Sequence, residues 1–551
     1  MLSPNQLRHL LRRGAQAVIV AQVCSQFVTL AVLSVLYRLL GPEPYGLLGM
    51  VYPLFYFLRI IIPGGLDVAA IQQPEVNPDQ ISVLFWVNQF LGLLVAAVAI
   101  AVAPLLAWFY ALAAACHALG FHAVAAAPRL VVSYYDPKIC AITMALAGTS
   151  ILLALGTQHQ AVLQRNMRLG AVAAIRLGAQ ILGGIAGISF AVVHAGVWAL
   201  VAQQYIEFLS VAILCWWIVP WRPQWMLWHT GVRRMLHLGG YFTFSQLMFF
   251  FTTNADKILV GALVGKVALG LYSQAFNLMM KPVQVLLVPL CGIMLPSLSR
   301  AAGNGPQYRS LLLGFFRAIG LAMFPCAIGL AIVGHEAMNV LGGARWMGAG
   351  RLLVVLGLAA FAQAFFTSFG GIFASVGRAD RLFRASIIIA LFMTGSFGVG
   401  YIVGQRYGDP LLGVAASFTL ALVFVVFPGY LLLCLNTVAI SLRDWLAQMY
   451  RPALAALGMG LAVLGVKYAL YAASGSLSVL AASWLAPWQC RPDCPLFWRL
   501  VFNRDTILLA GEITVGVLVY LLLARNEIRW LVGLRRESAP ATPCLDQPAT
   551  E

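Results

Sequence analysis

Fourteen apolar segments of about 20 to 30 residues follow one another along the chain, separated by shorter polar stretches. Each is long enough to cross the roughly 30 Å hydrocarbon core of a bilayer as a helix, and none alternates as membrane β-strands do. The pattern therefore predicts an all-α polytopic membrane protein with about 14 transmembrane helices. The segments cover residues 15–38, 46–65, 81–108, 139–161, 170–193, 195–219, 237–262, 268–297, 310–334, 350–375, 384–404, 410–435, 452–473 and 505–524.

The composition agrees with this interpretation and excludes the soluble classes of protein. Of the 551 residues, 61% are hydrophobic and only 10% are charged, whereas an average soluble domain has roughly 25% charged residues. Intrinsically disordered, fibrous and disulfide-stapled secreted proteins also have different compositions. The first apolar segment is too long for a signal peptide and lacks a small-residue cleavage site, so we expect it to remain as the first span.

The net charge of +17 is explained by membrane topology rather than by a nucleic-acid partner. No run of basic residues is longer than two, whereas nucleic-acid-binding proteins cluster such charge on one face. With a cytoplasmic N-terminus, 19 of the 35 Lys and Arg residues lie in inner loops, ten in outer loops and six within the segments. The positive-inside rule therefore predicts that both termini are cytoplasmic. The inner loop at 66–80, with three acids and no base, is the exception.

A short glycine motif recurs in the two halves of the chain. Leu40-Gly41-x-x-x-Tyr45-Gly46-Leu47 follows the first segment, and Val264-Gly265-x-x-x-Leu269-Gly270-Leu271 follows the seventh, 224 residues later. An offset of six segments, an even number, gives two halves of the same orientation, related by an axis along the membrane normal. The recurrence indicates such a parallel repeat. The alternative is that glycine-rich turns recur by chance.

The charged residues within the segments are the candidate functional residues. A charge in lipid is costly, so each needs a partner, a hydrated cavity or a short path to the interface. Before the last two segments, two acids against five bases leave a positive interior, which suits a diphosphate or another anionic substrate. We therefore predict a substrate cavity that contains Arg59, Arg176, Glu207, Lys257, Lys281 and Arg317.

Other interpretations of these charges stay open at this stage. The three arginines lie toward the cytoplasmic half, from which their side chains could reach the inner headgroups. Asp256 and Glu207 are candidates for proton or Na⁺ coupling, with structural ion pairing as the alternative. Lys467 and Glu512 fall at a similar depth in the last two segments, where we predict a structural ion pair.

The sequence contains no catalytic, cofactor or metal signature that withstands inspection. The turn at 261–266 lacks the spacing and the final Ser or Thr of a phosphate loop. Two long outer loops are expected at 109–138 and 474–504; in the first, His117 and His122 have the wrong spacing for one helical face. In the second, Cys490 and Cys494 form either a disulfide or two free thiols. We predict a protein that is not an enzyme and that has no cofactor and no metal site.

An ordered series of short motifs resembles one family of membrane proteins. Leu39-Leu40-Gly41-Pro42-Glu43-x-Tyr45-Gly46-Leu47 resembles a turn of the bacterial polysaccharide transporters. These are the lipid-linked oligosaccharide flippases of the multidrug/oligolipid/polysaccharide exporter superfamily. Further fragments follow in the family's order across about residues 14–436: Gly65-Leu66-x-x-Ala69-Ala70-Ile71-Gln72-Gln73, Phe85-Trp86-Val87-Asn88, Gly196-Val197-Trp198-Ala199-Leu200, Trp221-Arg222-Pro223, Asn254-Ala255-Asp256-Lys257, Leu269-Gly270-Leu271-Tyr272 and Pro296-Ser297-Leu298-Ser299.

The resemblance implies a fold and a set of domains. The fold is two pseudo-symmetric six-helix bundles around a central cavity, followed by two C-terminal helices. The implied domains are an N-terminal six-helix bundle at 1–219 and a C-terminal six-helix bundle at 220–436. Two additional transmembrane helices with a long outer loop follow at 437–534, and a disordered cytoplasmic tail occupies 535–551.

The resemblance also implies a function. Such proteins move an undecaprenyl-diphosphate-linked oligosaccharide from the inner to the outer leaflet of the bacterial cytoplasmic (inner) membrane. They work by alternating access, usually with cation-coupled antiport, for lipopolysaccharide or exopolysaccharide export. The implied partners are a polyprenyl-diphosphate-linked glycan, membrane lipid, and a polysaccharide polymerase and other assembly proteins. This chain departs from the family at Ala262 and Gln274, where a basic residue is common, so no single phosphate-binding arginine is implied.

Three other functions remain as alternatives. A drug/cation antiporter of the same fold would need a more acidic cavity. A flippase of the peptidoglycan precursor differs only in its substrate. A membrane glycosyltransferase or polymerase typically needs acidic residues in its first outer loop, where this chain has the single carboxylate of Glu43.

Overall fold

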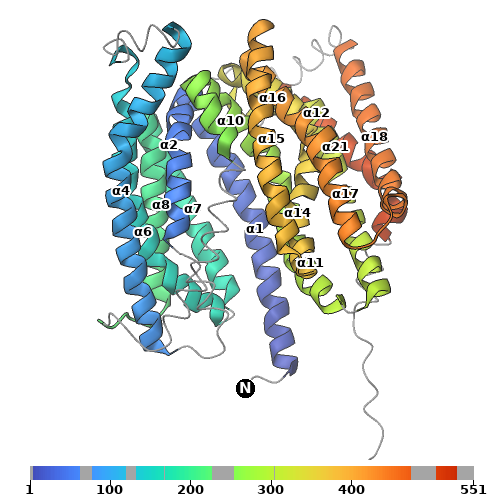
Figure 1. Cartoon of the computed structure of the whole chain (residues 1–551), viewed down its shortest axis with the longest axis horizontal. Coiled ribbons are helices and arrows are strands. Elements are labelled where there is room, and N and C mark those ends of the chain that lie inside the picture. The colour runs from blue at the N-terminus through green and yellow to red at the C-terminus, as the bar shows by residue number, and fades with distance from the viewer. Residues whose placement is uncertain are drawn as a thin grey trace, which may run out of the picture. The chain divides into compact units, whose positions relative to one another are not determined.

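The computed structural model describes residues 4–62, 77–119, 132–166, 168–225, 254–302, 304–472 and 504–529, and the regular elements in these ranges are helices (Figure 1). Within them, ten helices are long and apolar enough to cross a membrane, and two more candidates each consist of two helices with a break between them. The last predicted segment holds a shorter apolar helix, Leu508–Leu523. Most of the seventh lies outside the described residues. The predicted all-α, multi-pass fold is confirmed.

The first six predicted segments each form one continuous helix, and four of these begin with a proline. Proline fits the first turn of a helix because its missing N–H would have no partner there. In addition, the Asp136 side chain accepts a hydrogen bond from the backbone N–H of Lys138, 3.0 Å away. The helices are α1 (Pro4–Leu40), α2 (Pro42–Ile61), α4 (Pro78–Leu119), α6 (Pro137–Arg165), α7 (Leu169–Val192) and α8 (Val197–Ile218).

The later segments form helices that are interrupted more often. After the helical stretch 254–263, the eighth segment passes from α-helix into a π-helical turn directly after Pro282, which lacks the N–H that a continuous helix needs. The elements are α10 (Lys266–Pro282), η2 (Val283–Leu287), α11 (Val288–Ala301), α12 (Gly305–Gly342), η3 (Ala344–Trp346), α13 (Met347–Gly357), α14 (Ala360–Ser375), α15 (Ala379–Arg406), α16 (Pro410–Ala421), η4 (Leu422–Val426), α17 (Phe427–Thr437), α18 (Leu442–Ala472) and α21 (Arg504–Leu523).

Among the described helices, two extend eight or more residues beyond their predicted C-terminal ends. Helix α4 continues to Leu119, although the apolar segment was expected to end at 108, so the first eleven residues of the predicted outer loop 109–138 are helical. Alanine is the strongest helix former, and four of the five residues at 111–115 are alanine. Helix α12 likewise passes the predicted end at 334 and continues to Gly342. This second extension brings Glu336, expected in a loop, onto a helix.

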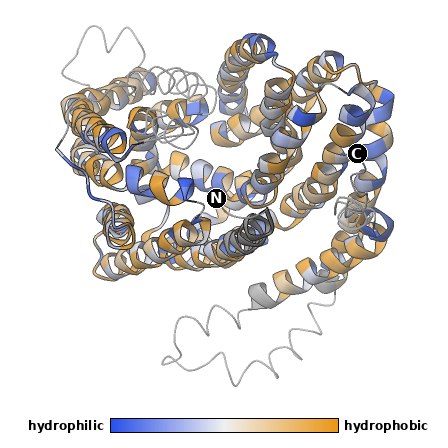
Figure 2. Cartoon of the chain, turned by 90° about the horizontal axis from the view of Figure 1, so that it is seen from below, coloured by the Kyte–Doolittle hydropathy of each residue, from blue (hydrophilic) through white to orange (hydrophobic). Residues whose placement is uncertain are grey.

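Large apolar side chains are exposed along the helices, as expected of a surface covered by lipid. Phe27, Phe90, Leu105 and Leu461 each expose about two thirds of their surface or more. Figure 2 shows hydrophobic residues along most of the helical ribbon. Soluble monomers rarely expose contiguous apolar patches of this kind. The described helices therefore fit a hydrocarbon environment.

The chain forms two compact units, and each is described below by itself. Unit 1 comprises residues 1–281, 337–356 and 383–421, and unit 2 comprises residues 282–336, 357–382 and 422–551. Unit 1 thus contains the first six helices together with one end of several later helices. Unit 2 contains the remaining parts of those helices together with α18 and α21. The predicted domain boundaries at 219 and 436 come from the family resemblance and not from this division into two units, so they stay a prediction.

Small residues set the close packing of the first six helices in unit 1. A Cβ atom added at Gly92 of α4 would lie 2.8 Å from the Cβ of Ala154 on α6. One added at Gly184 of α7 would lie 2.6 Å from a methyl group of Val32 on α1. Lipid supplies no hydrophobic force between helices, so membrane helices pack through such small residues.

The two copies of the glycine motif meet each other in unit 1. A Cβ atom added at Gly46 would overlap the carbonyl oxygen of Lys266, and one added at Gly270 would overlap that of Pro42. Residues 42 and 266, like residues 46 and 270, are 224 positions apart, so the contact is reciprocal. Chance recurrence of a glycine turn does not explain a reciprocal contact between the two copies. The crossing therefore supports the repeat that the sequence indicates.

Polar and aromatic contacts clamp the same end of unit 1. The Lys266 ammonium forms ion pairs with Glu43, at 2.8 Å, and Asp136, at 3.0 Å, which joins the starts of α2, α6 and α10. The Trp346 ring packs on Tyr37, with 4.4 Å between ring centroids, and its indole N–H donates to the Tyr37 carbonyl oxygen at 2.9 Å. These contacts, together with the Gly46–Gly270 crossing, are called the clamped end below.

Aromatic side chains form the core of unit 2. The Phe365 ring of α14 lies 6.0 Å from Phe316 of α12, 5.6 Å from Phe427 of α17 and 5.9 Å from Trp445 of α18, measured between ring centroids. Four helices therefore share one aromatic cluster. Helix α21 packs on α18, where a Cβ atom added at Gly516 would lie 3.0 Å from a Val463 methyl group.

The glycine crossing yields a stability prediction. We expect Gly46→Ala or Gly270→Ala to destabilise the folded protein by about 1–3 kcal/mol, because the added methyl group overlaps a backbone carbonyl that cannot rotate away. The measurement is the thermal stability of the purified protein in detergent. Gly398→Ala on α15 is the matched control, since nothing lies within 4 Å of its added Cβ. There the better helix propensity of alanine should leave stability unchanged or raise it. Equal effects at all three positions would contradict the crossing.

Candidate functional site

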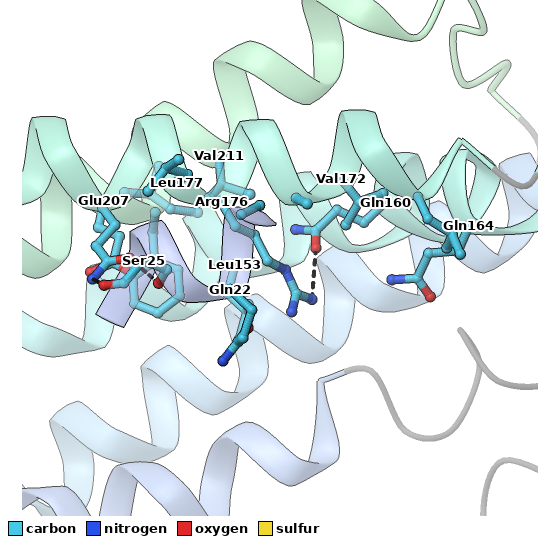
Figure 3. Close-up of a pocket in the computed structure, with 16 residues that line it drawn as sticks. Gln22, Ser25, Leu153, Gln160, Gln164, Val172, Arg176, Leu177, Glu207 and Val211 are labelled. Carbon is cyan, nitrogen blue, oxygen red and sulfur yellow. Dashed lines mark hydrogen bonds between the residues drawn. The ribbon is translucent and has the colours of Figure 1, made fainter. Parts of the chain in front are cut away.

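A polar cavity of about 600 Å³ lies among four helices of unit 1 and is the candidate functional site (Figure 3). Its size is within the range of pockets that hold small molecules. The apolar part of its wall comes from leucines, valines, alanines and Phe208. The polar lining comes from α1, α6, α7 and α8: Gln22, Ser25, Gln160, Gln164, Arg176, Gln180 and Glu207. This set of residues is called the polar cavity below.

The lining combines amide groups with one base and one acid. Each of the four glutamines carries two N–H donors and a carbonyl acceptor. Such an amide can donate a hydrogen bond to a hydroxyl group or accept one from it. The single guanidinium offers a planar fork of donors that fits a phosphate or carboxylate. The cavity is therefore suited to a ligand that carries both hydroxyl groups and an anionic group.

A hydrogen-bond network fixes one wall of the cavity. The Ser25 hydroxyl donates to the Gln180 carbonyl oxygen at 2.6 Å, and the Gln180 amide donates to the Thr29 hydroxyl at 2.5 Å. The same amide donates to the Ser25 backbone carbonyl at 3.2 Å. These bonds join α1 to α7 and hold the Gln180 side chain in one orientation.

Arg176 and Glu207, both predicted cavity residues, lie in this one cavity. Figure 3 shows the Arg176 guanidinium directed toward Gln160, whose carbonyl oxygen accepts one hydrogen bond at 3.2 Å. The guanidinium is exposed and makes no ion pair with any described residue, so most of its donors are available to a ligand. Glu207 on α8 is half-buried beside Gly183 of α7, where an added Cβ would lie 3.0 Å from the Glu207 Cβ.

Arg59 lies behind the cavity wall rather than in it. It is absent from the lining, but its guanidinium lies over the ring of Phe208, a lining residue, at 4.8 Å from the centroid. Its Nη2 donates to the Thr149 hydroxyl at 2.5 Å. Its charge also interacts with that of Glu207. Arg59 therefore supports the cavity through Phe208 and Glu207, while its Nε is buried without a hydrogen-bond partner in the described structure.

Asp256 and Lys257 have partners of their own in unit 1, outside the lining of the polar cavity. Asp256 is only 4% exposed and accepts a hydrogen bond from the Tyr272 hydroxyl at 3.0 Å. The Lys257 ammonium donates to the Asn254 side chain at 3.3 Å and lies over the Phe276 ring at 5.3 Å. These contacts join the helical stretch 254–263 to α10. A role of Asp256 in ion coupling stays a prediction.

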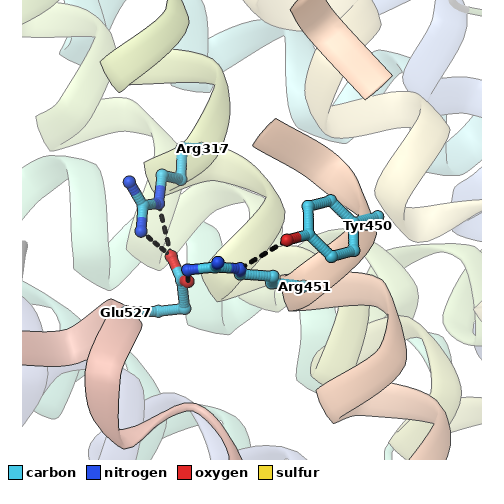
Figure 4. Close-up of polar contacts among 4 residues, drawn as sticks. All are labelled: Arg317, Tyr450, Arg451 and Glu527. Atoms are coloured by element: carbon cyan, nitrogen blue, oxygen red, sulfur yellow. Dashed lines mark hydrogen bonds and ion pairs between the residues drawn. The ribbon is translucent and has the colours of Figure 1, made fainter. Parts of the chain in front are cut away.

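Lys281 and Arg317 differ in how their charges are compensated. Lys281, near the end of α10, is half-buried, and no described residue accepts a hydrogen bond from its ammonium group. Arg317 on α12, in unit 2, forms an ion pair with Glu527, whose carboxylate also pairs with Arg451 at 3.5 Å (Figure 4). The Glu527 side chain is only 4% exposed. The charge of Arg317 is therefore compensated inside the protein.

The predicted ion pair between Lys467 and Glu512 is wrong, because Lys467 pairs with a different acid. The Lys467 ammonium pairs with Glu336 of α12 at 2.7 Å and donates to the Ile332 carbonyl oxygen at 3.0 Å. The error follows from the predicted end of the ninth segment, which placed Glu336 in a loop. Glu512 is still near enough for its charge to interact with both residues.

The pattern of charges in the sequence does not indicate the glutamines that line the cavity. Gln22, Gln160, Gln164 and Gln180 are uncharged, so a search for charges within apolar segments passes over them. Amide side chains that recur within or just beside apolar spans are the signal that would have found them, because hydrocarbon cannot satisfy their hydrogen bonds. The predicted residues His122, Cys490 and Cys494 lie outside the described residues.

Comparison with known proteins places these observations in a family. The model of the polysaccharide biosynthesis protein family matches residues 35–127 and 112–351. The teichuronic acid biosynthesis protein TuaB of Bacillus subtilis is 23% identical over 74% of this chain and 79% of its own length. The lipopolysaccharide biosynthesis protein WzxC of Escherichia coli is 20% identical, covering 83% and 87%. The succinoglycan biosynthesis transport protein ExoT of Rhizobium meliloti is 24% identical, covering 80% and 82%.

Solved structures share the fold. The lipid II flippase MurJ in an inward closed conformation matches with a TM-score of 0.61 and 12% identity, covering 94% of this chain and 99% of that one. An inward-facing multidrug resistance MATE family transporter of the MOP superfamily matches with a TM-score of 0.55 and 14% identity, covering 76% and 98%. At these identities the likeness establishes the fold alone. Because the family model matches more than half of its residues, the chain belongs to the polysaccharide biosynthesis protein family.

Proposed function

We propose that this protein translocates a polyprenyl-diphosphate-linked oligosaccharide from the inner to the outer leaflet of the bacterial inner membrane, for surface or exopolysaccharide export. Family membership and the names of the relatives support transport of a polysaccharide precursor rather than catalysis. The transporter fold of the structural neighbours supports alternating access. In this proposal both termini are cytoplasmic, and a membrane polymerase consumes the translocated glycan.

The polar cavity is the observation that carries the proposal. A diphosphate and its sugars cannot enter hydrocarbon without losing their hydrogen bonds, while the polyprenyl tail is stable there. A cavity with the amides of Gln22, Gln160 and Gln164 and an available guanidinium, on helices whose other faces are apolar, replaces the lost contacts for the polar part. Moving this substrate between leaflets requires no covalent step.

The position of the cavity along the helices supports alternating access. Ser25 in the cavity and Tyr37 in the clamped end are twelve residues apart on α1, which is about 18 Å along a helix. Asp136 in the clamped end, the residue before α6, and Gln160 of α6 in the cavity are 24 residues apart, or about 36 Å. Within unit 1 the cavity thus lies away from the clamped end, where contacts hold the helix ends together. By the charge count, the cavity is in the cytoplasmic half.

The direct test is transport in vesicles. Purified protein is reconstituted with a fluorescently labelled polyprenyl-diphosphate oligosaccharide, and the label accessible to an added quencher is followed with and without an ion gradient. We expect time-dependent movement of the oligosaccharide between leaflets. Transport of a lipid-linked peptidoglycan precursor alone, or of a lipophilic cation alone, would replace the proposal with one of the alternatives of the same fold.

Arg176 is expected to contribute directly to substrate binding. We predict that Arg176→Gln lowers transport about ten- to hundredfold at normal protein level, because a charge-assisted hydrogen bond contributes about 1.5–3 kcal/mol. Adding Lys281→Gln should lower transport further if both groups contact the diphosphate. Arg406→Gln is the control, since Arg406 is exposed at the end of α15, outside the polar cavity. Normal surface-polymer production by the Arg176→Gln variant would rule out this role.

Arg317 is expected to act through stability instead. Arg317→Gln leaves Glu527, buried in unit 2, with one arginine fewer, and breaking a buried ion pair costs about 3–5 kcal/mol. We therefore predict a lower melting temperature for Arg317→Gln and recovery of most of it in Arg317→Gln/Glu527→Gln, which removes both charges. Thermal melts of the purified proteins measure both effects. Normal stability of Arg317→Gln together with lost transport would instead place Arg317 on the substrate path.

A further inference from the structure

Three charged side chains of unit 2 come together on helices α12, α18 and α21, none of which lines the polar cavity. The Lys467 ammonium of α18 pairs with Glu336 of α12 at 2.7 Å. Glu512 on α21 and Lys467 on α18 are each one helical turn from the point where Gly516 and Val463 touch, and the charge of Glu512 interacts with those of Lys467 and Glu336. Glu336, Lys467 and Glu512 are called the triad below.

The triad lies beside an apolar seam, where the Lys467 and Glu336 side chains keep 22% and 25% of their surface exposed. Val333 of α12 and Met459 and Val463 of α18 form a buried cluster, against which Leu509 of α21 packs. Glu512 is one turn further along α21 and is only 5% exposed. The seam therefore places Glu512 where an ionised carboxylate is costly unless it is paired.

The hydrogen bonds of the triad are incomplete. Lys467 already donates to the Glu336 carboxylate and to the Ile332 carbonyl oxygen. One buried oxygen of Glu336 and one of Glu512, the Oε2 atom in each case, have no hydrogen-bond donor among the described residues. Buried polar atoms are normally paired, so both oxygens are positioned to accept a hydrogen bond from a protonated carboxyl group.

The net charge of the triad indicates that it can bind a proton. With all three groups ionised, the triad carries two negative charges and one positive charge, so one surplus negative charge lies at the seam. The acid and base that face Glu512 are Glu336 from α12 and Lys467 from α18; the Tyr520 hydroxyl of α21 donates elsewhere, to the Leu321 carbonyl oxygen at 2.6 Å. A single proton removes the surplus charge and also supplies a donor to a carboxyl oxygen.

A purely structural role does not account for Glu512. The Lys467–Glu336 pair is electrically neutral without Glu512. Glutamine or leucine at position 512 would therefore avoid a surplus charge. Glu512 therefore adds a cost that a structural pair does not need. A group that must gain and lose a charge does require such a carboxylate.

We propose that the triad is a proton-binding site that takes up one proton and thereby links α18 and α21 to α12. With the proton bound, the triad is neutral and the three helices remain packed at the seam. With the proton released, the surplus charge favours separation of α21 from the seam and entry of water. Binding of the proton stands on the triad alone, whereas a link to substrate movement rests on the proposed function.

Proton binding is measured on the purified protein in vesicles, without any transported substrate. Infrared difference spectra between about pH 8 and about pH 5, the range of perturbed carboxyl groups, report the appearance of protonated carboxylic acid. We expect the wild type to gain the equivalent of about one carboxylic acid more than Glu512→Gln. Glu336→Gln should also remove this signal, because Lys467 can then pair with Glu512 and no surplus charge remains.

Arg317→Gln/Glu527→Gln is the matched control, since it removes an equally buried carboxylate of unit 2 together with the charge of its partner and should keep most of the wild-type stability. That variant should keep the wild-type signal. Thermal melts identify any variant that fails to fold, and the second triad variant then decides. The same proton uptake in Glu512→Gln and Glu336→Gln as in the wild type, or no uptake by the wild type, would overturn the site.

Transport assays then test the link to function. If proton binding is coupled to transport, the response to a pH gradient should fall at least about fivefold in Glu512→Gln, the lower end of typical coupling effects. An unchanged response would overturn the coupling and leave the proton site in place. Absence of transport by the wild type, with proton uptake intact, would instead count against the proposed function.

Discussion

Hydrocarbon solvates neither charges nor unpaired backbone groups, and the polar parts of this protein are arranged around that constraint. The backbone meets it by forming helices throughout the described spans. The ionised side chains meet it in different ways. Arg317 and Glu527 compensate each other, Arg176 and Glu207 face a polar cavity, and Glu512 is left with a surplus charge at an apolar seam. Charges that are not compensated inside the protein are the ones from which a function can be inferred.

The same constraint explains how much of the fold could be predicted from sequence. Apolar windows report the stretches that lie in lipid, so the first six spans were found, although α1 begins and α4 ends eleven residues beyond the predicted bounds. Hydropathy does not report where a helix ends once it leaves the hydrocarbon. The alanines at 111–115 therefore extend α4, and α12 continues through Glu336 to Gly342, without an apolar signal. The glycine motif was predictable as a repeat, but the contact of Gly46 with the Lys266 carbonyl needs three dimensions.

The candidate site was predicted in part, for a related reason. A search for charges in spans identified Arg176 and Glu207, which line one cavity, and Arg59, which supports its wall. Such a search cannot identify the acid that compensates a given base, because the partner of Arg317 is 210 residues away in sequence. It also assigned Lys467 to the wrong acid. The cavity glutamines escaped because amides carry no charge, although they provide most of the hydrogen bonds that the cavity offers.

The lining of the polar cavity bears on which part of a substrate the protein would recognise. A cavity of about 600 Å³ holds a group of drug-like size, so a long glycan could place only its lipid-proximal end there. One guanidinium matches a diphosphate, and the three amides outside the Ser25–Gln180–Thr29 network match the hydroxyl groups of the sugars next to it. Recognition would then depend on the part that lipid-linked glycans have in common, while the distal sugars extend beyond the cavity. Under the proposed function, selectivity among glycans arises where those distal sugars pass, rather than at Arg176.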